Sequence, residues 1–398
     1  TNIISGIDLE KYEVHVLTNS RANEKEYEII NDLRIYRLKP TRLTTLLEKK
    51  NKNIIEILQY KLIKLIRVLL LPINYFTFPS FDIFYLMSYK HKVNRLIMRH
   101  EFKKVISLCK PFYNLNLILY IKKKKPNVNS TVYFLDHLHS DKYRNNFLLK
   151  RLIDRLVVKT YMKTTKNLDQ ILVLESERHF LESYNIISEK IEYVGIPVYI
   201  PRPVKVSNVQ KSKQNIKLIY AGTLDKDYRN PQYLFQVLDY ISKHGYKIEL
   251  NLYGQNNINR LINKFSNEVF TINNHGLIAR KEIEDLYDNN VFAINYCNAI
   301  QNSIPSKIFE LFSMNIPIIN IKQRKKDITD QFFDLYQNHI SLVEGESIEI
   351  SAKKLSMFFI DIITENNIKT KNPIFINGLE KYTPEYIIKT LNLEMKNE

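Results

Sequence analysis

Residues 303–320 combine side chains that suit the binding of a phosphorylated ligand. Pro305 fits the first turn of a helix, because its missing N–H group would have no partner there. In such a helix, Ser306, Lys307 and Glu310 share one face. Free backbone N–H groups, a hydroxyl and a lysine at a helix N-terminus attract phosphate, and a carboxylate one turn later can accept two hydrogen bonds from a ribose diol. The segment therefore predicts a site for a nucleotide diphosphate.

The elements around this site follow the order strand, turn, helix, strand that a Rossmann-like half requires. Apolar runs of strand length occur at 216–224, 249–254, 270–272, 291–296, 316–321 and 340–343. Gly222 and Gly254 stand at the ends of two of these runs, where a glycine lets the backbone approach a ligand closely. We expect the phosphate-binding helix to begin near residue 304.

This segment also resembles a known family motif. The residues from Pro305 to Glu310 resemble the Pro-Ser-Lys-x-x-Glu segment in the C-terminal domain of GT-B glycosyltransferases, which make capsule, lipopolysaccharide and exopolysaccharide. In that family the glutamate holds the donor ribose and the preceding turn meets the diphosphate. The resemblance therefore implies ribose binding by Glu310 and diphosphate binding by Ser306 and Lys307. Many members carry a second glutamate eight positions upstream, where this chain has Asn302.

A second stretch resembles the family segment in which a basic side chain after the first strand meets the donor diphosphate. Arg229 takes that place, and its planar fork can bind two phosphate oxygens. An exposed arginine in a turn is the alternative. The arginine often found directly after Gly222 is Thr223 here. Because the loop after the third strand frames the base in this family, the resemblance adds Gly276 and Leu277 to the expected donor site.

The N-terminal half contains a similar alternation of strand-length apolar runs and helical stretches. The runs lie at 12–18, 34–38, 81–87, 104–108, 131–135 and 170–174. Such alternation predicts a parallel sheet with crossover helices, and ligands bind beyond the carboxyl ends of the strands in sheets of this kind.

One of these strand ends is rich in polar groups, with Asp136, His137, His139 and Asp141 in a single loop. A carboxylate or imidazole there can orient or deprotonate a hydroxyl. The alternative is that Asp136 caps the next helix and the histidines are ordinary loop residues. The family resemblance puts this region on the acceptor side, so we expect Asp136 and His139 to act on the acceptor. A metal cluster lacks a further ligand in the loop, and we predict no metal site.

Composition limits the class of protein. The 398 residues suit two domains, and 59 Lys and Arg against 42 Asp and Glu give a net charge of +17, which favours anionic partners. Cys109 and Cys297 have no metal or redox spacing, which indicates free thiols in a reducing compartment. The sequence contains no apolar run long enough to span a membrane, and no dinucleotide-binding or P-loop motif.

A basic amphipathic helix is expected between residues 44 and 71, with lysines around an apolar stripe. The stripe consists of Ile54, Leu58, Leu62, Leu65 and Leu69. Such a helix can lie on an anionic bilayer, or it can cover the sheet with its lysines in solvent. Both interpretations fit the pattern.

The expected fold is α/β of the GT-B type, with two Rossmann-like domains facing each other across a cleft. We expect an acceptor-side domain at 1–200 that lacks its first strand, a linker at 201–215, and a nucleotide-sugar-binding domain at 216–378. A C-terminal helix within 379–398 is expected to pack back on the first domain. The chain starts as though inside a helix, which is why a strand is expected to precede it.

The expected function is a retaining hexosyltransferase that moves a sugar from a nucleotide diphosphate, with UDP-sugars favoured, to a lipid-linked glycan. Arg229 and Lys307 would stabilise the leaving diphosphate, and no cofactor is required. The expected location is the cytoplasmic face of the cell membrane, with peripheral attachment through basic helices and no nucleic-acid partner, since no recognition motif is present. The alternatives are a nucleotide-sugar epimerase of the same fold and a non-catalytic basic protein that binds membranes or nucleic acid.

Overall fold

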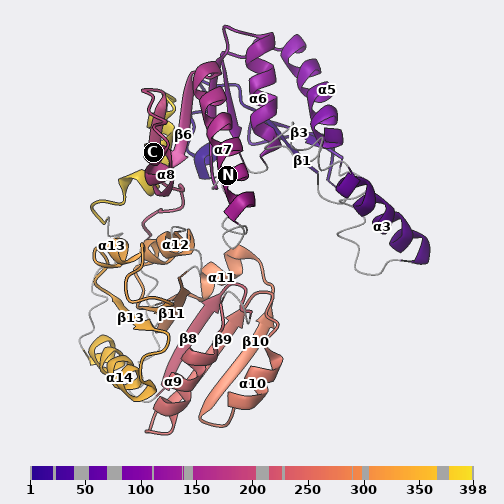
Figure 1. The fold of residues 1–398 in the computed structure, drawn as a ribbon. Helices are drawn as coiled ribbons and strands as arrows, with labels where there is room; N and C mark the ends of the chain where they lie inside the picture. Colours follow the sequence, from indigo (N-terminus) through magenta and orange to yellow (C-terminus); the bar gives the residue numbers. More distant parts are fainter. Residues whose placement is uncertain are drawn as a thin grey trace. The chain divides into compact units, whose positions relative to one another are not determined.

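The computed structural model describes residues 2–20, 24–39, 53–69, 83–109, 112–136, 138, 147–202, 215–225, 229–288, 290–297, 304–364 and 376–396. The chain forms two compact units (Figure 1). Unit 1 comprises Thr1–Ile196 and Glu385–Glu398, and unit 2 comprises Pro197–Pro384. Residues 203–214 of the predicted linker lie outside the described residues.

Unit 2 is built on a six-stranded parallel sheet with the order β10-β9-β8-β11-β12-β13. Its strands are β8 (Asn215–Ala221), β9 (Lys247–Tyr253), β10 (Phe270–Gly276), β11 (Val291–Tyr296), β12 (Ile318–Lys322) and β13 (His339–Val343). Counted along the chain of this unit, the order is 3-2-1-4-5-6, as in the dinucleotide-binding Rossmann fold. The direction in which successive strands are added reverses between β8 and β11, which are neighbours in the sheet.

Successive residues of a strand point to opposite faces of the sheet, so apolar strands need cover on both faces. Helices supply this cover. The helices are α9 (Gln232–Ser242), α10 (Asn259–Phe265), α11 (Arg280–Leu286), α12 (Lys307–Ser313), α13 (Asp330–Phe333), α14 (Ile348–Thr364) and the short 3₁₀ turn η3 (Glu380–Tyr382). Leu218 and Tyr220 of β8 pack in one hydrophobic cluster with α9 and α14. Ile219, between them, packs in the other cluster with α12 and α13. The continuous apolar strands are therefore buried on both faces.

Unit 1 contains two smaller sheets. The first is parallel, with the order β4 (Lys104–Leu108), β5 (Asn129–Tyr133), β6 (Gln170–Leu174) and β7 (Ile191–Val194). In the second, β1 (His15–Asn19) pairs in parallel with β3 (Leu33–Leu38), and β2 (Tyr27–Ile30) pairs antiparallel with β3. The helical elements are α1 (Asn2–Ser5), α3 (Ile54–Leu69), α5 (Ile83–Arg99), α6 (Tyr113–Lys124), α7 (Phe147–Asn167), η2 (Glu175–Glu177), α8 (Arg178–Ser183) and α15 (Pro384–Thr390).

The C-terminal helix α15 belongs to unit 1 although it follows unit 2 in the sequence. Ile387 of α15 and Leu391 just after it are buried in one hydrophobic cluster with Tyr133 of β5 and Leu172 of β6. The Gln170 side chain also donates a hydrogen bond of 2.7 Å to the Thr390 carbonyl oxygen. These contacts hold the chain end against the parallel sheet of unit 1.

The predicted strand at 81–87 is wrong where the structure describes it, because residues 83–87 open helix α5. The buried side chains continue at helical spacing, with Leu86, Tyr89, Val93, Leu96 and Ile97 on the packed face. A strand-length apolar run cannot by itself distinguish a strand from the first turns of a buried helix. The structure also contains β2, which the sequence analysis did not expect.

Three glycines meet at the carboxyl ends of β8, β9 and β10. The Gly222 N–H donates a hydrogen bond of 2.7 Å to the Tyr253 carbonyl oxygen, and the Gly254 N–H donates one of 2.7 Å to the Gly276 carbonyl oxygen. Gly254 has φ +144°, and a Cβ atom at this position would overlap the carbonyl group of Gly222. The edge of the sheet therefore requires glycine at 254 for both conformation and space.

We expect Gly254→Ala to destabilise the protein by more than about 3 kcal/mol, because two backbones would have to move apart. Gly245→Ala is the matched control, since Gly245 also has a positive φ, +97°, but no atom lies within 4 Å of the place that a Cβ atom would occupy there. The control should cost about 1 kcal/mol. Urea denaturation of the full chain measures both values. Equal effects of the two substitutions would contradict the close approach at Gly254.

Candidate functional site

The candidate site lies at the carboxyl edge of the unit 2 sheet, where the strand order reverses. β8 and β11 are hydrogen-bonded neighbours, with Ala293 paired to Ile219. The chain leaving β8 leads to Arg229, and the chain leaving β11 leads to α12. Ligands of open α/β sheets bind where two such loops separate. This placement follows from the topology and does not depend on any sequence motif.

Helix α12 begins at Lys307, later than the expected start near residue 304. Ser306 occupies its N-cap position with helical dihedral angles, and its side chain makes no capping hydrogen bond. Ile308 and Leu311 are buried, whereas the side chains of Lys307 and Glu310 retain 30% and 20% of their exposure. The predicted division of the helix into a packing face and an accessible face is present. Residues 298–303, which include Asn302, lie outside the described part of the chain.

The Glu310 carboxylate interacts with two cations. Its Oε2 atom lies 3.2 Å from Lys307 Nζ, and its Oε1 atom lies 3.5 Å from Arg280 Nη2. Each carboxylate oxygen keeps a further acceptor position, so a ribose diol can still donate to both. The two cations fix the orientation of the carboxylate before a ligand arrives.

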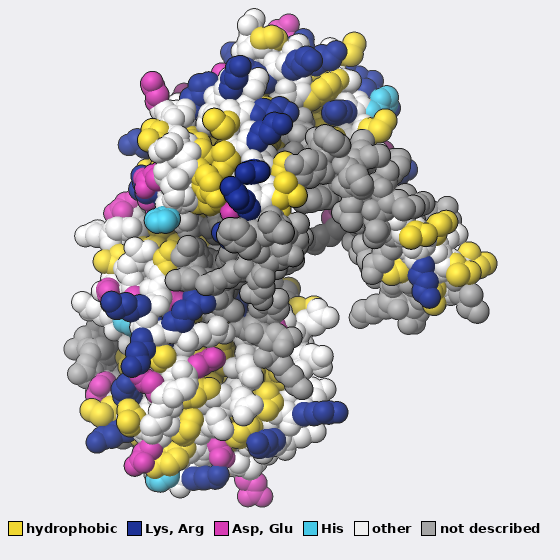
Figure 2. Space-filling model, viewed as in Figure 1, with side chains coloured by type: hydrophobic (Ala, Val, Ile, Leu, Met, Phe, Trp, Pro, Cys, Tyr) yellow, Lys and Arg dark blue, Asp and Glu magenta, His cyan; other side chains and the backbone are white. Residues whose placement is uncertain are grey.

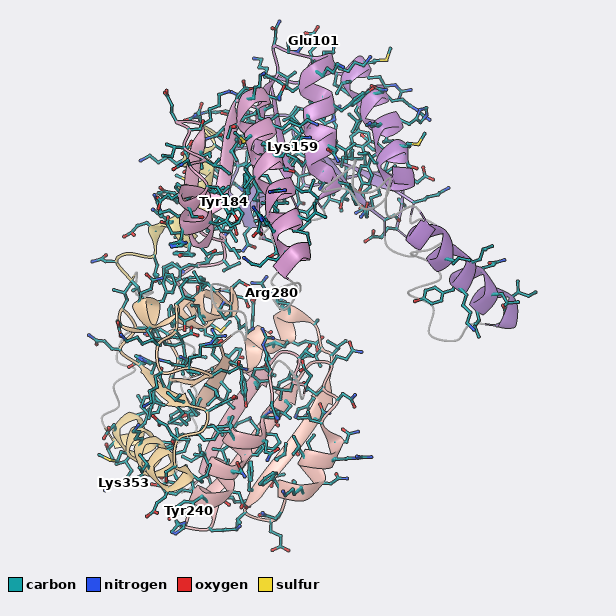
Figure 3. All side chains as sticks on the ribbon, viewed as in Figure 1. Glu101, Lys159, Tyr184, Tyr240, Arg280 and Lys353 are labelled. Carbon is teal, nitrogen blue, oxygen red and sulfur yellow. The ribbon has the colours of Figure 1, made fainter. Side chains whose placement is uncertain are left out.

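Arg280 is a site residue that the sequence analysis missed. It is the first residue of α11, directly after the loop that contains Leu277 and follows the end of β10 at Gly276 (Figure 3). The available signal was a basic residue at a helix start that follows a strand end. Nothing in the sequence indicated that α11 would bring this guanidinium to Glu310.

The ion pairs continue from Arg280 to the start of the predicted linker. Arg280 Nε lies 2.9 Å from Glu284 Oε1, and Arg202 Nη1 lies 2.6 Å from Glu284 Oε2. Burial alone would raise the pKa of Glu284, but the hydrogen bonds from Arg202 and Arg280 outweigh it and leave that pKa below its usual value. The Arg202 N–H also donates a hydrogen bond of 2.8 Å to the carbonyl oxygen of Ser313, at the end of α12. Three cations and two carboxylates thus alternate beside the site.

The lowered pKa of Glu284 predicts a pH-dependent contribution to stability. A depressed carboxyl pKa stabilises the folded state above the ordinary value of 4.5, and this stabilisation is lost as the pH falls through the folded-state value. We therefore expect Glu284→Gln to cost about 1–3 kcal/mol at pH 7 and progressively less below pH 4.5. Urea denaturation at several pH values measures this difference. The exposed Glu282 on the same helix supplies the control, Glu282→Gln, and a pH-independent cost at Glu284 would contradict the assignment.

Arg229 is held at the end of β8. The Asp225 N–H donates a hydrogen bond of 3.2 Å to the Arg229 carbonyl oxygen, which closes the loop. Burial raises the pKa of the Tyr220 hydroxyl, and the nearby Arg229 guanidinium, which hydrogen-bonds that hydroxyl, partly offsets the effect. Tyr220 also donates a hydrogen bond of 3.3 Å to the Thr223 carbonyl oxygen. Residues 226–228 lie outside the described part.

Tyr287, directly after α11, is a buried tyrosine whose pKa responds to predicted site groups. Burial raises the pKa of Tyr287, and the next largest contributions come from the Glu310 carboxylate and then from Tyr220. The Tyr287 hydroxyl has no hydrogen-bond partner among the described residues. Tyr287 therefore feels the charge of Glu310 and the hydroxyl of Tyr220, which hydrogen-bonds Arg229. Tyr287 is a second residue that the sequence analysis did not identify.

The remaining predicted donor residues lie along the same sheet edge. Gly222 and exposed Thr223 follow β8, and Gly276 ends β10 with φ +72°. Leu277, directly after Gly276, is 78% exposed and therefore accessible to a ligand. The structure thus brings all the predicted donor residues to the carboxyl ends of β8, β10 and β11.

The predicted acceptor residues belong to unit 1. Asp136 is half-buried, three residues after the end of β5. His139 lies outside the described residues, as do residues 137 and 140–146. Their roles on the acceptor remain predictions.

Among the described residues, one group of three side chains has the types and spacing of metal ligands. It consists of Glu13, His15 and His100 in unit 1. Glu13 Oε1 already accepts from His15 Nε2 at 2.8 Å and lies 2.8 Å from Arg34 Nη1. A guanidinium in this position repels a metal cation. A hydrogen bond to the second ring nitrogen usually orients a ligating imidazole, but buried His15 Nδ1 has no hydrogen-bond partner among the described residues. We therefore interpret the group as an ion-paired cluster.

Comparisons with solved structures show the fold. A sucrose-phosphate synthase from Thermosynechococcus elongatus matches with a TM-score of 0.59 at 10% sequence identity, covering 98% of this chain and 89% of that chain. The N-terminal domain of a Candida albicans trehalose-6-phosphate phosphatase matches with a TM-score of 0.51 at 11% identity, covering 90% of this chain and 83% of that domain. No protein-family model matches the sequence, and no curated protein does.

At such low identity these similarities concern architecture alone. They agree with the two parallel sheets of four and six strands and with the Rossmann order of unit 2. The predicted fold class is confirmed: the chain has the α/β fold of the GT-B glycosyltransferases.

Proposed function

We propose that this protein is a retaining glycosyltransferase of the hexosyl type that uses a nucleotide-diphosphate sugar, with UDP-sugars favoured. One observation supports the proposal most strongly. Arg229 and the pair Lys307 and Glu310 follow β8 and β11, the neighbouring strands at which the strand order reverses. A diphosphate and a ribose bound at this edge would find a guanidinium, an ammonium and a carboxylate within one site.

The proposed roles follow from where charge forms during the reaction. As the bond between the anomeric carbon and the diphosphate oxygen breaks, negative charge grows on the leaving diphosphate, and Arg229 and Lys307 stabilise it. Glu310 accepts hydrogen bonds from the ribose diol and so fixes the position of the donor. In retaining members of the resembling family the leaving phosphate takes the acceptor proton on the same face. This chemistry requires no additional base on the donor side.

The acceptor half of the proposal concerns unit 1. We propose a lipid-linked glycan as acceptor, in the synthesis of a cell-surface polysaccharide such as a capsule or exopolysaccharide, at the cytoplasmic face of the cell membrane. Asp136 and His139 would orient the acceptor hydroxyl, whose proton goes to the leaving phosphate. The net charge of +17 supports a site of action near anionic lipid.

A panel of nucleotide sugars tests the donor chemistry. A donor at about 100 times its dissociation constant should add about 2.7 kcal/mol of stability and raise the melting temperature by several degrees. A glycosyltransferase should also hydrolyse this donor slowly and release the nucleoside diphosphate. An epimerase would instead return an isomeric nucleotide sugar. If no nucleotide sugar stabilises the protein while RNA or anionic vesicles do, the glycosyltransferase proposal is wrong.

A further inference from the structure

Helix α3 exposes a continuous stripe of large aliphatic side chains. Ile55, Leu58, Leu62 and Leu65 are 65%, 61%, 57% and 56% exposed. Their spacing of three, four and three residues puts them on one side of the helix. Figure 2 shows hydrophobic side chains gathered on this helix beside a basic one. Single exposed aliphatic side chains are common on proteins, but four in one stripe indicate an interaction surface.

The core of unit 1 does not account for this stripe. None of the described residues of α3 belongs to a hydrophobic cluster of unit 1. A helix that covers a sheet is expected to bury its apolar face. The described side chains of α3 do not show such a buried face. Leaving such side chains in water forgoes about 1.5–3 kcal/mol each relative to full burial.

The helix also has its own start signal and does not rely on tertiary contacts for it. The Glu56 N–H donates a hydrogen bond of 2.8 Å to Asn53 Oδ1, and the Asn53 N–H donates one of 3.0 Å to Glu56 Oε2. This reciprocal pair is a capping box, which stabilises a helix N-terminus locally. A segment with its own cap can remain helical while its apolar side faces a non-protein environment.

Charge distinguishes a lipid surface from other apolar partners. The sequence of α3 contains Lys61, Lys64 and Arg67 but only one acidic residue, Glu56, which the cap already uses. Basic residues beside an apolar stripe suit anionic headgroups above acyl chains, and each contributes about 1 kcal/mol near such a surface. The 16 residues span about 24 Å. No helix in the described part of the chain meets the length and hydropathy needed to cross a bilayer.

We propose that α3 lies in the plane of an anionic membrane, with the stripe of Ile55, Leu58, Leu62 and Leu65 inserted at the boundary between headgroups and acyl chains. The exposed Lys61 side chain remains at the level of the lipid phosphates. This inference rests on the part of the proposed function that assigns a lipid-linked acceptor. It does not depend on the donor chemistry of unit 2.

Vesicle sedimentation of the full chain tests the proposal. Vesicles of phosphatidylcholine with about 30% phosphatidylglycerol supply the anionic surface that the charges of α3 should recognise. The double variant Leu58→Gln with Leu62→Gln removes half of the stripe and keeps good helix formers. The control is Met357→Gln with Ile360→Gln on α14 of unit 2, where the replaced side chains are 56% and 48% exposed.

We expect the α3 variant to bind these vesicles at least about tenfold more weakly than the wild type, because two inserted leucines are lost. The α14 control should bind like the wild type, and pure phosphatidylcholine vesicles should bind less of every variant. Circular dichroism and stabilisation by UDP show whether the α3 variant is folded. Stabilisation by UDP also separates the two proposals, since the donor proposal can fail while vesicle binding persists.

Unchanged vesicle binding by the α3 variant would overturn the inference. Equal binding to neutral and anionic vesicles would also overturn it, because the charge argument would then be wrong. A wild type that dimerises through α3 in solution and does not bind vesicles would assign the stripe to a second copy of the chain instead. Each of these results can be obtained with the same purified proteins.

Discussion

Replacing Glu310 by glutamine is expected to lower kcat/KM for the nucleotide-sugar donor by about 10²-fold, equivalent to about 3 kcal/mol. The carboxylate is proposed to accept two hydrogen bonds from the ribose diol, and bonds to a charged acceptor are stronger than bonds to a neutral amide. Its orientation is set by Lys307 and Arg280, at 3.2 and 3.5 Å. The measurement is steady-state donor turnover.

A modified donor separates ribose binding from a merely structural role. If Glu310 binds the diol, a 2′-deoxyribose donor should be poor for the wild type but should cost the Glu310→Gln variant little more. The two changes would then be strongly non-additive, as expected for groups in direct contact. Glu282→Gln, on exposed α11 surface, controls for the lost negative charge. Additive losses from the variant and the modified donor would remove Glu310 from the ribose site.

The sheet of unit 2 could be predicted because its strands are buried on both faces. The runs at 216–224 and 291–296 contain mostly apolar residues between turn signals. Such runs are too short for a typical helix, and the intervening stretches have helical periodicity. The site was predicted from the residues at 303–320, and the strand order that places it beside β8 and β11 comes from the structure.

Unit 1 was less predictable where its elements are only partly buried. Every residue of β3 is half-buried, and β2 is largely exposed, so neither carries a strong pattern. The run at 81–87 has the length and composition of a strand, yet the burial of Leu86 and Tyr89 continues along α5 at helical spacing. Short apolar runs leave this choice to tertiary packing.

The missed site residues are those whose partners are distant in sequence. Arg280 reaches Glu310 from 30 positions earlier, and Arg202 reaches Glu284 from 82 positions earlier. Sequence periodicity reports the face of one helix and not which helix lies opposite it. Tyr287 was missed for another reason: its hydroxyl is buried, and the pattern of an aromatic residue at the end of an apolar helix face is typical of core packing.

The second large effect is expected at Arg229, whose replacement by alanine should weaken the binding of UDP by about 10- to 100-fold. The side chain is proposed to contact the diphosphate. The alanine variant should therefore lose much less affinity for UMP, which lacks the second phosphate. Arg229→Lys keeps the charge but not the planar fork, so its affinity for UDP should fall between those of the wild type and the alanine variant. Isothermal titration of UDP and UMP to the full chain measures these differences.

The control for this experiment is Arg260→Ala, which removes an exposed arginine from α10 of the same unit. It accounts for the general effect of losing one positive charge. That effect would weaken the binding of UDP and of UMP in similar proportion and would decline with added salt. Arg229 hydrogen-bonds the Tyr220 hydroxyl, so Arg229→Ala also removes a hydrogen-bond partner of that hydroxyl. Thermal denaturation measures the resulting loss of stability separately. Equal losses for UDP and UMP at Arg229 would place the guanidinium away from the diphosphate. The convergence of the β8 and β11 loops on one ligand would then have to be rejected.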